Sequence, residues 1–169
     1  VTLDRAETTG GLRVSTTGSI TDSGVGNVVV GGTANLSAGT GNNIVLDTAS
    51  NNFGTVQISS ANNVTLVDVN AVVLGTSTVS GNLSVTANGA VAQSAALTVV
   101  GAATFNVGAG NNLTLNQAAN NFTTLSVASA NNVTLRDTNA ITLGNVTVPG
   151  TLAVTTGGTQ NQAVGTTMN

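Results

Sequence analysis

The chain of 169 residues contains no cysteine, histidine, lysine, tryptophan or tyrosine, and only 5 % of its residues are charged. Without cysteine there can be no disulfide and no thiolate metal site. Without cysteine or histidine, no nucleophile–imidazole pair can form. Three arginines and no lysine are too few to neutralise a nucleic-acid backbone. We therefore expect no catalytic residues, no metal site, no cofactor and no nucleic-acid partner, so the chain is predicted not to be an enzyme.

Long apolar runs and helical periodicity are also missing. No stretch approaches the ~18 apolar residues that a membrane-spanning helix needs, which argues against membrane insertion. No segment keeps a helical period, so helix content should be close to nil. Apolar residues nevertheless make up 40 % of the chain, and this apolar content at low charge argues against disorder. Most of the remaining residues are Thr, Ser, Asn and Gly, which predicts a neutral surface of hydroxyls and amides.

Apolar residues alternate with polar ones in short bursts, as in Val64-Thr65-Leu66 and Leu83-Ser84-Val85. A period of two over a few residues indicates a half-buried strand. Gly or Asn separates nearly every burst, and we expect both residue types to supply positive φ at tight corners. Phe53 and Phe122 are expected to fill the interior and to stack along its length. The predicted core residues are Ile44, Leu46, Phe53, Val64, Leu66, Leu83, Val85, Leu113, Leu115, Phe122, Val133 and Leu135.

The strongest pattern is a 69-residue repeat. Asn51-Asn52-Phe53 returns as Asn120-Asn121-Phe122, and Ala61–Leu66 returns as Ala130–Leu135. Repetition with strand-like content is typical of a stacked array in which each unit buries its apolar face on the next. The chain is read as one continuous segment without a second domain. Its parts are a partial repeat over 1–9, copy one over about 10–80, copy two over 81–149 and a partial copy over 150–169.

Within each copy a shorter spacing of about 20 residues recurs, which is typical of one coil of a β-solenoid. It separates Asn42-Asn43 from Asn62-Asn63 and Asn111-Asn112 from Asn131-Asn132. We predict an all-β, right-handed parallel β-helix with coils of about 20 residues, since parallel crossovers are nearly always right-handed. The spacing from Asn82 to Asn112 is half as long again, so one coil per copy should be longer than the others. Ala103–Val107 is the candidate for an extra strand there.

The paired asparagines are interpreted as a structural ladder at stacked corners. Asn tolerates the left-handed conformation and can hydrogen-bond to an Asn in the next coil. The alternative is recognition of a glycan or of ice. We expect the pairs to occupy equivalent corners, so that the 69-residue offset superposes them. The predicted ladder residues are Asn42, Asn43, Asn62, Asn63, Asn111, Asn112, Asn131 and Asn132.

Acidic residues offer little chemistry. Asp68 and Asp137 lie one repeat apart, each two positions after an inward Leu. A calcium site would require clustered Asp and Gly, which this sequence lacks. We interpret both as solvated acids in turns, and Arg136 with Asp137 as a surface pair of little energetic weight.

Four segments, Gly41–Leu46, Asn51–Phe53, Asn62–Gly75 and Gly81–Val85, resemble the long repeats of filamentous-haemagglutinin-type exoproteins. These are giant Gram-negative surface adhesins of the two-partner secretion and autotransporter kind. The resemblance covers about 10–156. It implies a right-handed parallel β-helix shaft, secreted or displayed on the outer membrane, with no catalytic residues in the shaft.

We therefore expect an extracellular or outer-surface location and a structural or adhesive role. The first alternative is a self-assembling extracellular filament whose subunits stack head to tail. A lower alternative is an ice-binding solenoid, which would require regular outward Thr rows. The expected partners are further coils along the axis, from the parent chain or from other copies, and a host or neighbouring cell surface.

Overall fold

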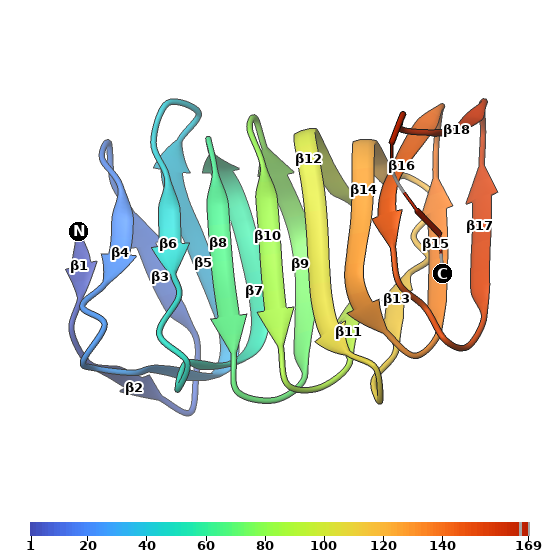
Figure 1. The fold of residues 1–169 in the computed structure, drawn as a ribbon. Helices are drawn as coiled ribbons and strands as arrows, with labels where there is room; N and C mark the ends of the chain where they lie inside the picture. The colour runs from blue at the N-terminus through green and yellow to red at the C-terminus, as the bar shows by residue number, and fades with distance from the viewer. Residues whose placement is uncertain (166, 169) are drawn as a thin grey trace.

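The computed structural model describes residues 1–165, 167 and 168, which contain no helix. They form one sheet of parallel strands wound into a right-handed β-solenoid, as the sequence predicts. Figure 1 shows the coils stacked from the N-terminal to the C-terminal end. The strands are β1 (Thr2–Leu3), β2 (Ala6–Thr8), β3 (Leu12–Ser15), β4 (Ile20–Asp22), β5 (Val28–Gly39), β6 (Ile44–Leu46), β7 (Asn52–Ala61), β8 (Val64–Asp68), β9 (Val72–Val79), β10 (Leu83–Ala87), β11 (Val91–Gln93), β12 (Leu97–Gly108), β13 (Leu113–Leu115), β14 (Asn121–Ala130), β15 (Val133–Asp137), β16 (Ile141–Val146), β17 (Leu152–Thr156) and β18 (Gln160–Gln162).

Two main walls face each other across the core. We name wall A the column β1, β4, β6, β8, β10, the second halves of β12 and β14, β16 and β18. Wall B is the column β3, the second halves of β5 and β7, β9, β11, β13, β15 and β17. Each strand of a wall pairs in parallel with the strand one coil away, so the chain visits each wall once per coil.

The coils vary somewhat in length. On wall A the step from one coil to the next is short between Leu125 and Leu143 and longest between Ile20 and Ile44. No such step is as long as the spacing from Asn82 to Asn112, so the predicted long coil is wrong. Ala103 pairs with Leu83 as an ordinary rung of wall A, and the expected extra strand is the second half of β12.

Alternation in the sequence becomes alternation of burial. In β8 the residues Val64, Leu66 and Asp68 point inward and are buried, while Thr65 and Val67 between them are partly exposed. The same alternation runs through β10, β13 and β15. All twelve predicted core residues are at most 2 % exposed. The interior is one continuous cluster of Val, Leu, Ile, Ala and three Phe side chains, and burial of this cluster is the main favourable term in folding.

The two sequence copies are related by half a turn. Val64 pairs with Ile44 and Leu83 on wall A, whereas Val133, its counterpart in the next copy, lies on wall B beside Leu113 and Leu152. In Figure 1, β8 and β10 point downward and their counterparts β15 and β17 point upward. One repeat therefore spans three and a half coils. The two plugging phenylalanines, Phe53 and Phe122, are both buried but lie three and a half coils apart along the axis.

The half turn places the equivalent corners of the two copies on opposite sides of the solenoid. Asn62 stacks on Asn42 through a backbone hydrogen bond, and Asn131 stacks on Asn111 in the same way. The two pairs, however, precede strands of opposite walls, so the four asparagines do not occupy one corner. The spacing between Asn82 and Asn112 corresponds to one and a half coils, which is why it suggested a longer coil.

We predict that Leu66→Asp lowers the free energy of unfolding by several kcal/mol, because it places an unpaired carboxylate in the core of β8. The matched control is Thr65→Asp, which puts the same carboxylate on the outer face of the same strand and should cost much less. Urea unfolding followed by circular dichroism measures both. Equal midpoints for the two variants would show that the assigned inward face of β8 is wrong.

Candidate functional site

Asparagine side chains form a ladder at the corner that precedes wall A. The Asn43 side-chain oxygen accepts hydrogen bonds from the backbone N–H of Asn63 at 3.1 Å and from the Asn63 side-chain amide at 3.2 Å. The Asn63 side-chain oxygen accepts from the Asn82 backbone at 2.9 Å, and the Asn82 oxygen accepts from Ala102 at 2.8 Å. Each rung thus satisfies a backbone donor of the next coil, where the regular strand ladder has stopped.

The same ladder recurs half a turn away, before wall B. The Asn112 side-chain oxygen accepts from the Asn132 side-chain amide at 3.0 Å and from its backbone at 3.3 Å. The Asn132 oxygen in turn accepts from the Thr151 backbone at 2.8 Å. The predicted ladder residues Asn43, Asn63, Asn112 and Asn132 therefore form two short ladders on opposite sides of the solenoid.

The first asparagine of each pair has a different task. The side-chain amide of Asn42 donates to the Ala38 carbonyl at 2.9 Å, and that of Asn111 donates to the Val107 carbonyl at 2.8 Å. The sharp bends before them use glycine, since Gly39 has φ of 86° and Gly108 has φ of 79°. No residue other than glycine in 1–165, 167 and 168 has positive φ. The expectation that Asn adopts the left-handed conformation here is wrong. The Asn side-chain amide instead stabilises the bend by donating to the carbonyl of the residue before the glycine.

Asp68 and Asp137 are buried and accept backbone hydrogen bonds, so their reading as solvated turn acids is wrong. They are 2 % and 3 % exposed. Asp68 accepts from the backbone of Phe53 at 2.7 Å and of Asn70 at 2.8 Å. Asp137 accepts from Phe122 at 2.7 Å and from Asn139 at 3.0 Å. Both carboxylates thus connect the strand that ends at them to the corner of the preceding coil. Arg136, by contrast, is exposed because it alternates with Asp137.

Burial sets the electrostatics of Asp68. Removal from water raises the pKa of the Asp68 carboxyl above its ordinary value of 3.8, and the hydrogen bonds from Phe53 and Asn70 act in the opposite direction by favouring the charged form. The carboxyl group therefore has a structural role with an electrostatic cost. Among the described residues, no group of three or more Asp, Glu, His or Cys side chains could hold a metal ion.

A second set of buried polar groups was not predicted from the sequence. Asn51 and Asn120 are completely buried. The Asn51 amide donates to Asp22 at 2.7 Å, and its oxygen accepts from the Val28 backbone at 2.8 Å. The Asn120 amide likewise donates to Gln93 at 2.7 Å, and its oxygen accepts from the Leu97 backbone at 3.0 Å.

The two copies therefore fill one architectural position with different chemistry, a carboxylate at Asp22 and a neutral amide at Gln93. The Asp22 side-chain oxygen also accepts a hydrogen bond from the Thr48 backbone N–H at 3.0 Å. The Gln93 side-chain oxygen likewise accepts from the Gln117 backbone N–H at 3.1 Å. Two signals were available in the sequence. Asn51 recurs at Asn120, and an offset two positions longer than the repeat aligns Asp22 with Gln93.

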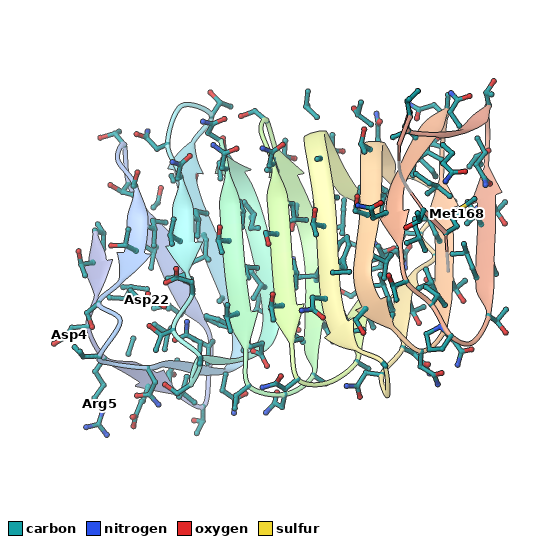
Figure 2. The ribbon with its side chains drawn as sticks, in the orientation of Figure 1. Asp4, Arg5, Asp22 and Met168 are labelled. Atoms are coloured by element: carbon teal, nitrogen blue, oxygen red, sulfur yellow. The ribbon has the colours of Figure 1, made fainter. Side chains whose placement is uncertain are left out.

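Charged side chains gather at the N-terminal end. Five of the nine charged residues lie within the segment that ends at Asp22, and Figure 2 labels three of them, Asp4, Arg5 and Asp22, at that end. Arg5 and Glu7 form an exposed ion pair at 2.9 Å. With Asp68 and Asp137 buried, the later coils carry only Asp47 and Arg136 as exposed charges among the residues described. Such a surface offers neither a basic nor an acidic binding patch.

One shallow depression of about 200 Å³ lies beside Arg136. It is lined by Ala118, Arg136, Asp137, Thr138, Thr155, Thr156 and Gly157. Each Asp137 oxygen that could face the depression already accepts a backbone hydrogen bond.

Comparison with known proteins identifies a repeat family. The family described as repeats of unknown function (DUF5649) matches three consecutive stretches, 1–60, 61–129 and 130–169. The middle stretch has the same length as the repeat found in the sequence. Neither the curated proteins nor the solved structures gave a match to the chain. The described part of the chain has no helix able to cross a membrane.

We predict that Asp68→Ala lowers the free energy of unfolding at neutral pH by about 1–3 kcal/mol, because it leaves the buried Phe53 N–H without an acceptor. Asp47→Ala is the matched control, since Asp47 is exposed and its removal should change stability by less than about 0.5 kcal/mol. Chemical denaturation measures both variants.

The same Asp68→Ala variant, compared with the parent, tests the electrostatics of Asp68. Because the pKa of Asp68 is raised in the folded state, the folded chain binds more protons than the unfolded chain between the ordinary value and the raised one. The difference in free energy of unfolding between the unmutated chain and Asp68→Ala should therefore grow as pH falls from neutral toward the ordinary pKa of 3.8. A difference that shrinks over this interval would contradict the assigned burial.

Glycine is required where the ladder passes from one coil to the next. A Cβ on Gly81 would collide with the Asn63 side-chain oxygen and would lie 3.0 Å from the Asn62 carbonyl. We predict that Gly81→Ala destabilises the chain by about 1–3 kcal/mol through overpacking. Gly41→Ala is the control, because nothing lies within 4 Å of its Cβ. Thermal unfolding of the two variants should separate them clearly, and equal melting temperatures would argue against a tight ladder.

Proposed function

We propose that this chain, which belongs to the family of repeats of unknown function (DUF5649), is a segment of the shaft of an extracellular bacterial surface protein. The observation that carries the proposal is the uninterrupted axial stack. Every wall strand from β4 to β16 is hydrogen-bonded to a strand on each side. Nothing but further coils is needed to lengthen such a rod, and its length increases by about 4.8 Å per coil.

The surface supports a spacer role. It is built mainly from Thr, Ser and Asn and has few exposed charges after the first coils. Neutral hydroxyl and amide groups are hydrated without attracting nucleic acid or anionic lipid. A shaft of this kind would extend an adhesive surface away from the cell, in keeping with the resemblance to filamentous-haemagglutinin-type repeats. Extracellular location and adhesion are parts of this proposal.

Catalysis is not part of the proposed role. The acids that recur with the repeat, Asp68 and Asp137, are buried and bound to backbone donors. They are thus positioned to stabilise corners. Turnover of a glycan by this chain that disappeared in Asp68→Asn or Asp137→Asn, with folding retained, would contradict the non-enzymatic role.

Assembly into a filament is the second candidate, and it would use the outermost strands of the stack. Inward-facing Leu3 and Leu12 at one end, and Leu152 and Val154 at the other, are only partly buried although they pack against the core. A sheet edge with free backbone groups and apolar side chains can add another strand. A head-to-tail contact of this type does not close and would propagate. The occupant of each end would be a further coil, from the parent chain or from another copy.

An ice-binding role receives less support. The outward row on wall A runs through Thr2, Thr21, Val45, Thr65, Ser84, Thr104 and Ser126. Valine and serine interrupt the threonines. The regular Thr row that such a surface would need is therefore not formed on wall A.

We predict that the isolated chain elongates with rising concentration and that Val154→Lys suppresses this elongation, because it puts a charge on the open apolar face of β17. Ala153→Lys is the matched control, since Ala153 points outward from the same strand, and this variant should elongate like the parent. Analytical ultracentrifugation and electron microscopy measure the outcome. If the unmutated chain stays monomeric at high concentration, axial association is contradicted. If both variants suppress elongation equally, net charge and not the end face controls elongation.

A further inference from the structure

The half-turn relation between the copies governs the geometry of any array of these repeats. Each 69-residue unit advances the chain by three and a half coils, because strands of wall A in copy one have their counterparts in wall B in copy two. β10 and β17 illustrate this relation, since they occupy equivalent positions in successive copies and lie on opposite walls. Two units span seven coils and return the chain to the wall on which it began.

We propose that the number of 69-residue repeats between two surface features sets whether these features face the same side of the rod or opposite sides. Gain or loss of one repeat would turn everything beyond it by half a turn and move it by about 17 Å along the axis. Two features that share a face would then oppose each other, and a second gain or loss would restore the shared face. The proposal deepens the proposed shaft function, on which its biological meaning rests.

The local contacts favour repeat gain or loss without damage to the fold. Ser60-Ala61 and Ser129-Ala130 have the same sequence, so removal of 61–129 recreates an existing junction. The segment beginning at Ala130 would then stack on the coil that contains β6, in place of the one that contains β13. These two strands have the same pattern of buried residues, and the same Asn pair precedes each of them.

The ladders make the join specific. Asn132 now bonds to the side-chain oxygen of Asn112, and after the deletion it would face Asn43, which already makes the same two bonds to Asn63. Burial at the junction is likewise preserved, since Asp137 would take the position of Asp68. The energy of the joined rod should therefore resemble that of the parent per coil, as in other repeat proteins, while the direction of the distal surface changes.

The test measures facing with spin labels, and the absence of cysteine from the chain makes each introduced cysteine a unique attachment site. One pair is Thr21→Cys with Ala153→Cys, whose side chains point outward from opposite walls. The other is Arg13→Cys with Ala153→Cys, both on wall B. Pulsed electron paramagnetic resonance gives the label distances in the full chain and in the variant lacking 61–129.

In the deletion variant Ala153 takes the place of Ser84, three coils from Thr21 on the same wall. In the full chain the two labels of the Thr21 pair lie on opposite walls, with an axial separation of about 31 Å. In the deletion variant we expect them on the same wall, with an axial separation of about 14 Å to which the label arms add. The Arg13 pair should change from co-facial at about 34 Å to opposed. If both pairs shorten along the axis but keep their original faces, the half-turn rule is wrong.

A second variant covers failure of the deletion to fold. Insertion of one additional copy of 61–129 should bring the Thr21 pair onto one face at about 48 Å, and retention of opposite faces would overturn the proposal. Circular dichroism and cooperative unfolding check that each variant is folded. The label distances report only the geometry of the rod. If they are as expected but the chain forms neither a shaft nor a filament, the proposed function is rejected and the half-turn rule stands.

Discussion

The backbone hydrogen bond between successive coils is the interaction on which the rest of this structure depends. It fixes the rise at about 4.8 Å and places each residue above the equivalent residue of the coil below. Any inward side chain therefore packs against its predecessor and successor, which is why Val, Leu, Ile and Phe recur in aligned rows. Any corner, where the strand ladder is interrupted, must find other partners for its backbone donors.

The buried polar side chains answer that requirement. Asn63 and Asn132 receive donors from the coil that follows, and Asp68 and Asp137 accept the N–H groups of Phe53 and Phe122 from the coil that precedes. Asn51 with Asp22, and Asn120 with Gln93, perform the same task at another corner. The exchange of an acid for an amide between copies indicates that the position requires an acceptor oxygen and not a charge. Residues that look suited to chemistry are thus committed to the architecture.

Because of the half-turn relation, the rod has two equivalent faces. A repeat of a whole number of coils would stack every copy of a surface motif on one side. Three and a half coils instead place the Asn ladder, the buried acid and the plugging phenylalanine alternately on opposite sides. A ligand that recognised a motif carried by each repeat would therefore meet it on both faces of the rod. Repeat number then controls direction as well as length.

The sequence alone determined the fold class and the interior. Period-two alternation identified the inward residues of β8, β10, β13 and β15, and the close recurrence of Asn pairs identified the coil, because both signals are local. The phase of the long repeat could not be obtained in this way. The spacing between Asn82 and Asn112 is compatible with one long coil or with one and a half ordinary coils, and only the pairing of strands across the walls distinguishes them.

The tertiary structure likewise decided the role of Asp68 and Asp137. Their inward direction follows from alternation after Leu66 and Leu135. The backbone donors that make a buried carboxylate tolerable, however, belong to Phe53 and Phe122, which lie well before the acids in the sequence. Donor and acceptor are brought together only when the coils stack, so no local pattern could have revealed the pairing.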